Sequence, residues 1–273
     1  MNQLPHTIAF IYILSAIGYV TYLVRQDEFW NQAGFYLLIA GCSLHTFSIG
    51  YGTVQTGHLP VHNLRETLSM VAWAMAILFI VFQALYHLKI LGAFASPLSA
   101  VVMLISAQLP TNPVDAPAAF NSIWLFFHII TVFLGDAAFA LAFGVGIFYL
   151  VQEQAIKTKT HGFFYRRLPS LEFIDTTGYA CIVIGFTLLT LGLITGFAYA
   201  KAAWGRFWSG DPKEIWSGIA WLLYAALLHG RISLGWRGRK AAIMAIIGFA
   251  VLMFTFFGVN FFLKGHHGDF TRW

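Results

Sequence analysis

Residues 204–216 read Trp-Gly-Arg-Phe-Trp-Ser-Gly-Asp-Pro-Lys-Glu-Ile-Trp and connect two long apolar runs. The segment combines dense tryptophan with charge and a turn, and Trp221 extends the aromatic pattern into the run that follows. Tryptophan is enriched at the boundary between a bilayer and water, where its ring meets both phases. We therefore interpret residues 200–216 as a tryptophan-rich loop at a membrane surface, forming an aromatic platform for a flat apolar ligand.

The composition of the whole chain agrees with a membrane location. Of the 273 residues, 59% are hydrophobic and only 10% are charged, whereas a soluble domain carries about 25% charged residues. This deficit of charge assigns the chain to the integral membrane proteins. The net charge of +5 comes from Lys and Arg between apolar runs, where they set topology, so it does not indicate nucleic-acid binding.

Eight apolar runs are long enough to cross a bilayer, which takes roughly 20 residues of helix. They are 7–24, 33–54, 67–88, 91–109, 122–151, 177–199, 212–234 and 241–263. We predict an all-α integral membrane protein, a bundle of about eight transmembrane helices that forms one polytopic domain over residues 1–273. Only Lys89 and Ile90 separate the third and fourth runs, which predicts a tight helical hairpin.

The distribution of Lys and Arg predicts how the bundle is oriented, because these residues accumulate in cytoplasmic loops. If the runs cross in turn, one set of connections carries ten of them and the other set six. The clusters at 166–167 and 237–240 both belong to the richer set. We therefore expect the tryptophan-rich loop and both termini on the outer side of a cell inner (plasma) membrane.

The two cysteines, Cys42 and Cys181, fall inside apolar runs and form no Cys-x-x-Cys pair. We expect them to be small buried residues rather than a disulfide or a thiol redox site.

Two helix starts are marked by capping residues. Asp211 suits the N-cap position, with Pro212 first and Glu214 third in the helix. Asn63 and Glu66 repeat the arrangement before the third run. For Asp211 and Glu214 two interpretations remain open, capping alone or contact with a ligand.

Histidine is costly in hydrocarbon, so a histidine within a span is a functional candidate. His128 lies near the outer end of the fifth run, and His267 follows the eighth run on the outer side. His45 lies at mid-depth in the second run, and His229 lies near the cytoplasmic end of the seventh. For each one the alternative is an ordinary hydrogen-bonded residue, but His128 and His267 beside the tryptophans favour a ligand role.

The ligand that fits this combination is haem. Histidine is a good axial ligand for its iron, and an aromatic floor suits the apolar face of a porphyrin. The propionates could meet Arg206, Lys213 or Arg65. Asp136, the acidic residue deep in the fifth run, is either a carboxylate that holds a histidine ring or a packing residue.

These residues resemble the CcsA/ResC-type cytochrome c assembly proteins, a family of membrane haem-handling proteins with a tryptophan-rich outer loop. The resemblance covers most of the chain. It is carried by three segments: Trp204 to Trp216 with Trp221-Leu222-Leu223-Tyr224 and His229, then Gly57-His58-Leu59-Pro60 with Asn63 and Glu66, and last Val259-Asn260 with Gly265 and His267. Where the family usually has Trp-x-Trp-Asp, this chain has Trp-Ser-Gly-Asp at 208–211, which removes one ring from the platform.

The resemblance implies the following roles. His128 and His267 would ligate haem b beside the loop, whose contact residues would be Trp204, Trp208, Asp211, Trp216 and Trp221. His229 would be an intramembrane ligand for haem arriving from the cytoplasmic side, with its second ligand supplied by a ResB/CcsB-like membrane partner. His45 falls at a position where the family often has histidine, and it is a cofactor-binding candidate with no assigned ligand role.

Two functions of different class follow from the resemblance. In the first, the protein carries haem across the bilayer and presents it for covalent attachment to apocytochrome c, as part of a holocytochrome c synthase complex. In the second, it is a HemX-like haem-binding regulator or scaffold without ligation activity. A weaker third reading is a transporter of another apolar ligand.

Overall fold

The computed structural model describes residues 3–110, 122–159 and 162–259. These residues form helices joined by short connections. The long helices are α1 (Leu4–Arg25), α2 (Glu28–Thr56), α3 (Leu64–Tyr86), α4 (Gly92–Gln108), α5 (Ile123–Lys157), α6 (Leu171–Trp204), α7 (Pro212–Ser233) and α8 (Arg239–Met253). A short 3-10 turn, η1 (Lys89–Leu91), precedes α4, and a π-helical turn, η3 (Phe254–Gly258), continues α8.

The all-α prediction is confirmed. In the described ranges, eight helical segments are long and apolar enough to cross a membrane, and each overlaps one of the predicted runs. The third and fourth segments form the expected tight hairpin through His87 and η1. The two largest differences are the end of α5 at Lys157 rather than 151 and the start of α6 at Leu171 rather than 177. At the start of α6 the cause is visible in the sequence. Glu172 and Asp175 lower the hydropathy there, although Ser170 already caps the helix.

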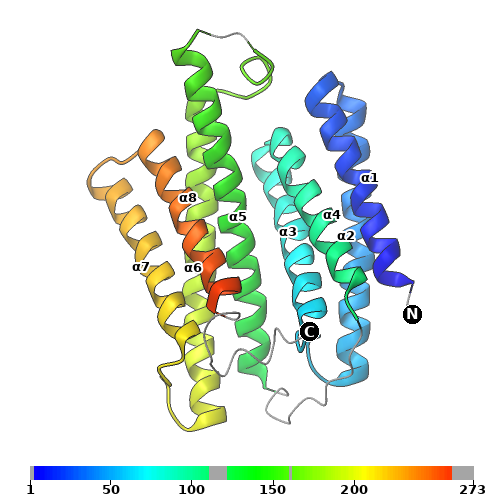
Figure 1. The fold of residues 1–273 in the computed structure, drawn as a ribbon, viewed down its shortest axis with the longest axis vertical. Helices are drawn as coiled ribbons and strands as arrows, with labels where there is room; N and C mark the ends of the chain where they lie inside the picture. Colours follow the sequence, from blue (N-terminus) through cyan, green and yellow to red (C-terminus); the bar gives the residue numbers. More distant parts are fainter. Residues whose placement is uncertain (1–2, 111–121, 160–161, 260–273) are drawn as a thin grey trace.

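The helix α5 joins two groups of helices (Figure 1). On one side, α1 packs against α2 and α4, and α3 packs against α4. On the other side, α6 and α8 pack against α5, and α7 packs against α6 and α8. The tightest pairing in the bundle is that of α5 with α6. We call the two groups the α1–α4 half and the α5–α8 half.

Glycines on α6 allow its close approach to α5. A Cβ atom at Gly185 would lie 2.7 Å from Phe139, one at Gly192 would lie 2.7 Å from Val132, and one at Gly196 would lie 2.8 Å from His128. Small residues let helix backbones come together in this way in membrane proteins. This packing fixes where the first turns of α5 lie against the last turns of α6.

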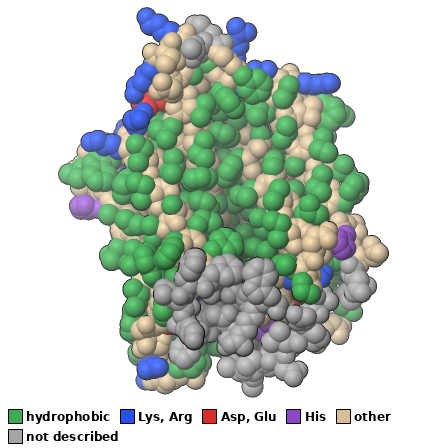
Figure 2. Space-filling model, viewed as in Figure 1, with side chains coloured by type: hydrophobic (Ala, Val, Ile, Leu, Met, Phe, Trp, Pro, Cys, Tyr) green, Lys and Arg blue, Asp and Glu red, His purple; other side chains and the backbone are tan. Residues whose placement is uncertain are grey.

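The charged residues collect at the ends of the bundle, and its flanks are apolar (Figure 2). Large side chains such as Phe47 and Ile232 are more than half exposed within the helices, as expected of helices that face lipid. Lys and Arg gather at the end that carries η1 and the α7–α8 connection. We call this the basic end. Several ion pairs fasten helices there, including Lys89 to Glu28 and Arg231 to Asp175.

The buried cysteines were predicted correctly. Cys42 and Cys181 are both buried and not in a disulfide. Cys42 packs in the core cluster with residues of the α1–α4 half, and Cys181 lies on the face of α6 that meets α5.

Candidate functional site

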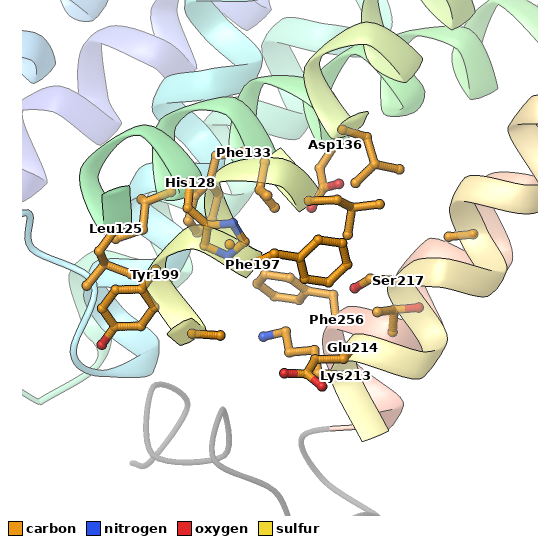
Figure 3. Close-up of a pocket in the computed structure, with 18 of the residues that line it drawn as sticks. Leu125, His128, Phe133, Asp136, Phe197, Tyr199, Lys213, Glu214, Ser217 and Phe256 are labelled. Carbon is orange, nitrogen blue, oxygen red and sulfur yellow. The ribbon is translucent and has the colours of Figure 1, made fainter. Parts of the chain in front are cut away.

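A cavity opens at the end of the α5–α8 half opposite the basic end (Figure 3). Its walls come from α5, α6, α7, the end of α8 and the turn η3, together with two residues of the segment around the start of α3. Apolar and aromatic side chains form most of the lining, and the polar groups that line it include His128, Asp136, Lys213, Glu214 and Ser217. The internal volume is about 180 Å³. We call it the His128 cavity.

His128 lies in the second turn of α5, and its ring is held by α6. The ring nitrogen Nδ1 donates a hydrogen bond to the carbonyl oxygen of Gly192, at 2.7 Å. Because a carbonyl only accepts, the proton lies on Nδ1, and Nε2 carries the lone pair when the ring is neutral. This is the arrangement in which a metal-binding histidine is usually found, with its second nitrogen tied to a carbonyl or carboxylate.

Asp136 and Lys213 reach into the same cavity from different helices. Asp136 is two turns beyond His128 on α5, and Lys213 is the second residue of α7 (Figure 3). Within the described part of the chain, neither side chain makes a hydrogen bond or an ion pair, although an electrostatic attraction links them. The Lys213 ammonium lies 5.9 Å from the centre of the Phe256 ring. Of the two interpretations of Asp136, the structure does not support holding the His128 ring, because Gly192 does that.

The connection between α6 and α7 is short and held by a carboxylate. Only residues 205–211 lie outside the helices, so 200–204 and 212–216 of the predicted loop are helical. Glu214 accepts hydrogen bonds from the backbone N–H of Ser209 and of Gly210, at 2.9 and 3.0 Å, and from the Ser209 hydroxyl at 2.9 Å. Asp211 caps α7 by accepting from the backbone N–H of Lys213 at 2.8 Å. Asp211 thus has the capping role that the sequence predicted, and Glu214 instead holds the connection through Ser209 and Gly210. Contact of either carboxylate with a ligand stays a prediction.

The backbone at Gly210 has a conformation that favours glycine. Its φ angle is +76°, a region that residues with a Cβ adopt at a cost of about 1–2 kcal/mol. The turn that brings the Gly210 N–H to Glu214 therefore favours glycine. A tryptophan at this position would strain the turn in the form it has here.

The four candidate tryptophans have different partners. Trp204 lines the cavity and meets Tyr199 edge-on, whereas Trp208 is about half exposed and lies 6.0 Å from Phe197 between ring centres. Trp216 packs edge-on against Phe254 of η3. Trp221 donates from its indole N–H to the Thr190 hydroxyl at 2.9 Å, which ties α7 to α6. Trp204 thus lines the cavity, Trp208 lies near the lining residue Phe197, and Trp216 and Trp221 contact neighbouring helical segments.

The segment before α3 closes one side of the site. Asn63 caps α3 by accepting from the Glu66 N–H, and Glu66 accepts from the His62 N–H. Val61 lines the cavity and belongs to a hydrophobic cluster with Leu125 near the start of α5. The second signature segment therefore lies beside His128, which its position in the sequence did not reveal.

The other three candidate histidines do not line the cavity or lie outside the described residues. His45 is buried in the α1–α4 half, with Nδ1 3.2 Å from the Tyr12 hydroxyl and Nε2 2.8 Å from that of Ser69. His229 is exposed on α7, toward the basic end. His267 lies outside the described residues, so its distance from His128 is not part of the described structure.

Sequence reasoning missed several residues that line the cavity. Phe133 follows His128 on α5, and Phe197 and Tyr199 precede Trp204 on α6. Of these, Phe197 had a usable signal, because it lies seven positions, or about two helical turns, before Trp204 and so shares its face. Phe256 had no such signal, since η3 departs from regular α-helical spacing.

The fold and the site together define a class, that of polytopic membrane proteins with a histidine-bearing cavity beside a tryptophan-containing connection. A sequence model of the family described as Cytochrome C assembly protein matches residues 61–267. The match includes the tryptophan-rich segment, Asn63 and Glu66 of the second signature segment, and the whole α5–α8 half. The chain belongs to the cytochrome c assembly protein family.

Within that family the chain is of the CcsA type. The cytochrome c biogenesis protein CcsA of Guillardia theta is 33% identical over 282 residues, covering 92% of this chain and 93% of that protein. CcsA of Synechococcus sp. (strain CC9902) is 32% identical, covering 95% and 93%. CcsA of Prochlorococcus marinus (strain MIT 9301) is 36% identical, covering 78% and 76%.

A solved structure shares the fold. The structure titled cytochrome c heme lyase CcmF aligns with a TM-score of 0.63 and 13% identity, over 98% of this chain. The chain spans about half of that protein, 48% of its length. At this identity the likeness shows the fold alone, and it confirms that the eight-helix arrangement occurs in a solved protein.

Proposed function

We propose that the protein binds haem b at the His128 cavity and presents it for covalent attachment to apocytochrome c. The haem is the substrate in this proposal. His128 ligates its iron through Nε2, with His267 as the second ligand on the same side. The observation that carries the proposal is the hydrogen bond from His128 Nδ1 to Gly192, which leaves the ligating nitrogen with its lone pair.

The size of the cavity bears on how haem would bind. Its volume of about 180 Å³ is below the roughly 300–1,000 Å³ of pockets that enclose drug-sized ligands. A porphyrin is larger than most such ligands, so the macrocycle is not enclosed. It lies instead across the mouth, where Trp204 and Trp208 expose 38% and 49% of their surface. A haem held at a rim keeps its vinyl edge accessible to another protein.

The attachment reaction adds two thiols of a Cys-x-x-Cys-His segment of the apocytochrome across the two haem vinyl groups. Each addition forms one carbon–sulfur bond, and the thiol hydrogen ends on the neighbouring vinyl carbon, so no oxidant is consumed. The contribution of this chain is to hold the haem by its iron and orient it, which makes the encounter effectively intramolecular. The reaction would be that of a holocytochrome c synthase complex.

The proposal also includes the path that haem takes through the bundle and the role of a partner protein. The basic end faces the cytoplasm, because Lys and Arg accumulate there, and the cavity faces the outer side of the plasma membrane. Haem enters near His229, which is exposed on α7. A ResB/CcsB-like membrane protein covers that face and supplies the second ligand. In this arrangement the protein carries haem from one end of the bundle to the other.

Coexpression with a ResB/CcsB-like partner and a reporter apocytochrome tests the proposal. The purified complex should show a Soret band, and the reporter should stain for covalent haem only when this chain is present. A haem-binding regulator of the HemX-like kind would give the Soret band, but the reporter would acquire haem without it. A colourless complex with partner and haem supplied contradicts the proposal.

A further inference from the structure

Lys213 and Asp136 also line the His128 cavity, and ligation of the haem iron by His128 gives neither of them a role. One side chain is acidic and the other is basic. They enter one apolar cavity from α5 and α7 and make no ion pair within the described residues (Figure 3). Charged side chains inside membrane proteins usually pair with one another or line a path for a ligand or ion. The gap between these two groups therefore accommodates a polar group of the ligand.

Asp136 acts on Lys213 from inside the cavity, and Asp211 also acts on it from the start of α7. Glu214 directs its oxygens to Ser209 and Gly210 in the connection. Asp211 accepts from the backbone N–H of Lys213 as the cap of α7. Asp136 has neither kind of engagement, and its attraction acts on the Lys213 ammonium across the cavity.

Of the three cations that the sequence offered for a propionate, only Lys213 lines the cavity. Arg65 donates to the carbonyl oxygen of Leu109 at 2.9 Å. Arg206 is exposed in the connection between α6 and α7. An ammonium that lies beside an aromatic ring and within an apolar wall is suited to one carboxylate, because the attraction is strong where water is scarce.

We propose that Lys213 is the carboxylate-binding group of the His128 cavity and that it receives a propionate of the haem, displacing its interaction with Asp136. The inference rests on the proposed function and adds a subsite to it. A propionate arm has only five heavy atoms, so it fits a volume of about 180 Å³ that a whole porphyrin does not. Asp136 holds the ammonium in the cavity before haem arrives and competes with the propionate afterwards.

Binding of hemin and of hemin dimethyl ester to the purified full-length chain tests this. The ester carries the same ring and iron but no charged carboxylate. The wild-type protein should bind hemin more tightly than the ester by roughly tenfold to a hundredfold, the range for a charge-assisted hydrogen bond. Lys213→Met should bind both equally, at the affinity of the wild type for the ester, and Lys213→Arg should keep the preference. Asp136→Asn should bind hemin several-fold more tightly and leave the affinity for the ester unchanged.

The design distinguishes the two ways of failing. Equal wild-type affinity for both compounds, or a preference for hemin that survives in Lys213→Met, overturns the subsite and leaves haem binding intact. Failure of the wild type to bind either compound overturns the proposed function and the subsite together. Binding of the ester by Lys213→Met with wild-type affinity shows that this variant is folded. Weaker hemin binding in Asp136→Asn contradicts the role given to Asp136.

Discussion

The two halves of the bundle differ in the partners of their polar side chains. In the α1–α4 half they satisfy one another: His45 bonds to Tyr12 and Ser69, and Tyr19 donates to Gln83. In the α5–α8 half, His128, Asp136 and Lys213 converge on a cavity, and the last two make no hydrogen bond or ion pair within the described residues. Polar groups that satisfy one another specify the packing of a core. Polar groups that converge on a cavity indicate a binding site.

His45 and His128 illustrate this difference between the two halves. His45 and His128 both lie in predicted spans and both are cofactor-binding candidates, although the sequence analysis assigns a ligand role only to His128. In the structure, both nitrogens of His45 contact hydroxyl groups of its own half, whereas His128 has one nitrogen tied to Gly192 and lines the cavity. The difference predicts that mutations of the first act on stability and that mutations of the second act on haem.

The largest expected effect is that of His128→Ala. It removes an iron ligand, so covalent cytochrome c formation in cells should fall by more than the roughly 10- to 100-fold that loss of an outer-shell partner costs. Haem staining of a reporter cytochrome, normalised to the membrane level of the protein, measures it. His45→Ala is the matched control and should retain haem attachment on the same scale. Equal losses in the two variants would remove the distinction between the halves.

A smaller effect is expected from Gly196→Ala, which leaves every polar group in place. The added Cβ would lie 2.8 Å from His128 Nδ1, so the ring must shift and its hydrogen bond to Gly192 must weaken. Haem affinity should fall by roughly tenfold, at the lower limit for such partners. Gly218→Ala is the control, because a Cβ at Gly218 meets nothing within 4 Å. A normal affinity in Gly196→Ala would mean that the ring position does not matter.

His45→Ala should lower the stability of the protein in detergent. It leaves the hydroxyls of Tyr12 and Ser69 without this partner in a buried place, which costs about 1–3 kcal/mol. Thermal unfolding followed by circular dichroism measures the change. The position and width of the haem spectrum should be unaltered in the folded fraction, and an altered spectrum would give His45 a role in ligation after all.

The smallest effect is predicted at Gly210, in the connection next to the cavity. Gly210→Ala and Gly210→Trp should both cost about 1–2 kcal/mol of stability, because both place a Cβ at a φ of +76°. The two variants should be alike within error, as the cause is the backbone. If Gly210→Trp instead stabilises the protein or tightens haem binding, the ring that the family usually has there matters more than the turn.

Much of the fold could be predicted because bilayer-crossing helices are visible as apolar runs. The caps at Asp211 and Asn63 were also predictable, since a cap is a local pattern. The start of α6 was placed too late, because hydropathy does not report helix that continues past an apolar run. Glu172 and Asp175 belong to α6, and Asp175 accepts from Arg231 at the basic end.

The arrangement of the site was less predictable, because it depends on contacts distant in the sequence. The partner of His128 is a carbonyl 64 residues away, and any residue could supply that group. Asp136 and Lys213 line one cavity because α5 and α7 both border it. No local sequence pattern encodes this arrangement. The tryptophans could be recognised as a group from the sequence. Their partners could not, since Trp216 packs against Phe254 and Trp221 donates to Thr190.

The most direct test of the account is the absorption and low-spin EPR spectrum of the haem-loaded complex in a His128→Gly variant, recorded with and without added imidazole. The substitution removes the ring that the account assigns to iron, and free imidazole can take its place. The account predicts that the low-spin signal and the Soret position are lost in the variant and restored by imidazole. A variant whose spectrum equals that of the wild type without imidazole would contradict the claim that His128 holds the iron.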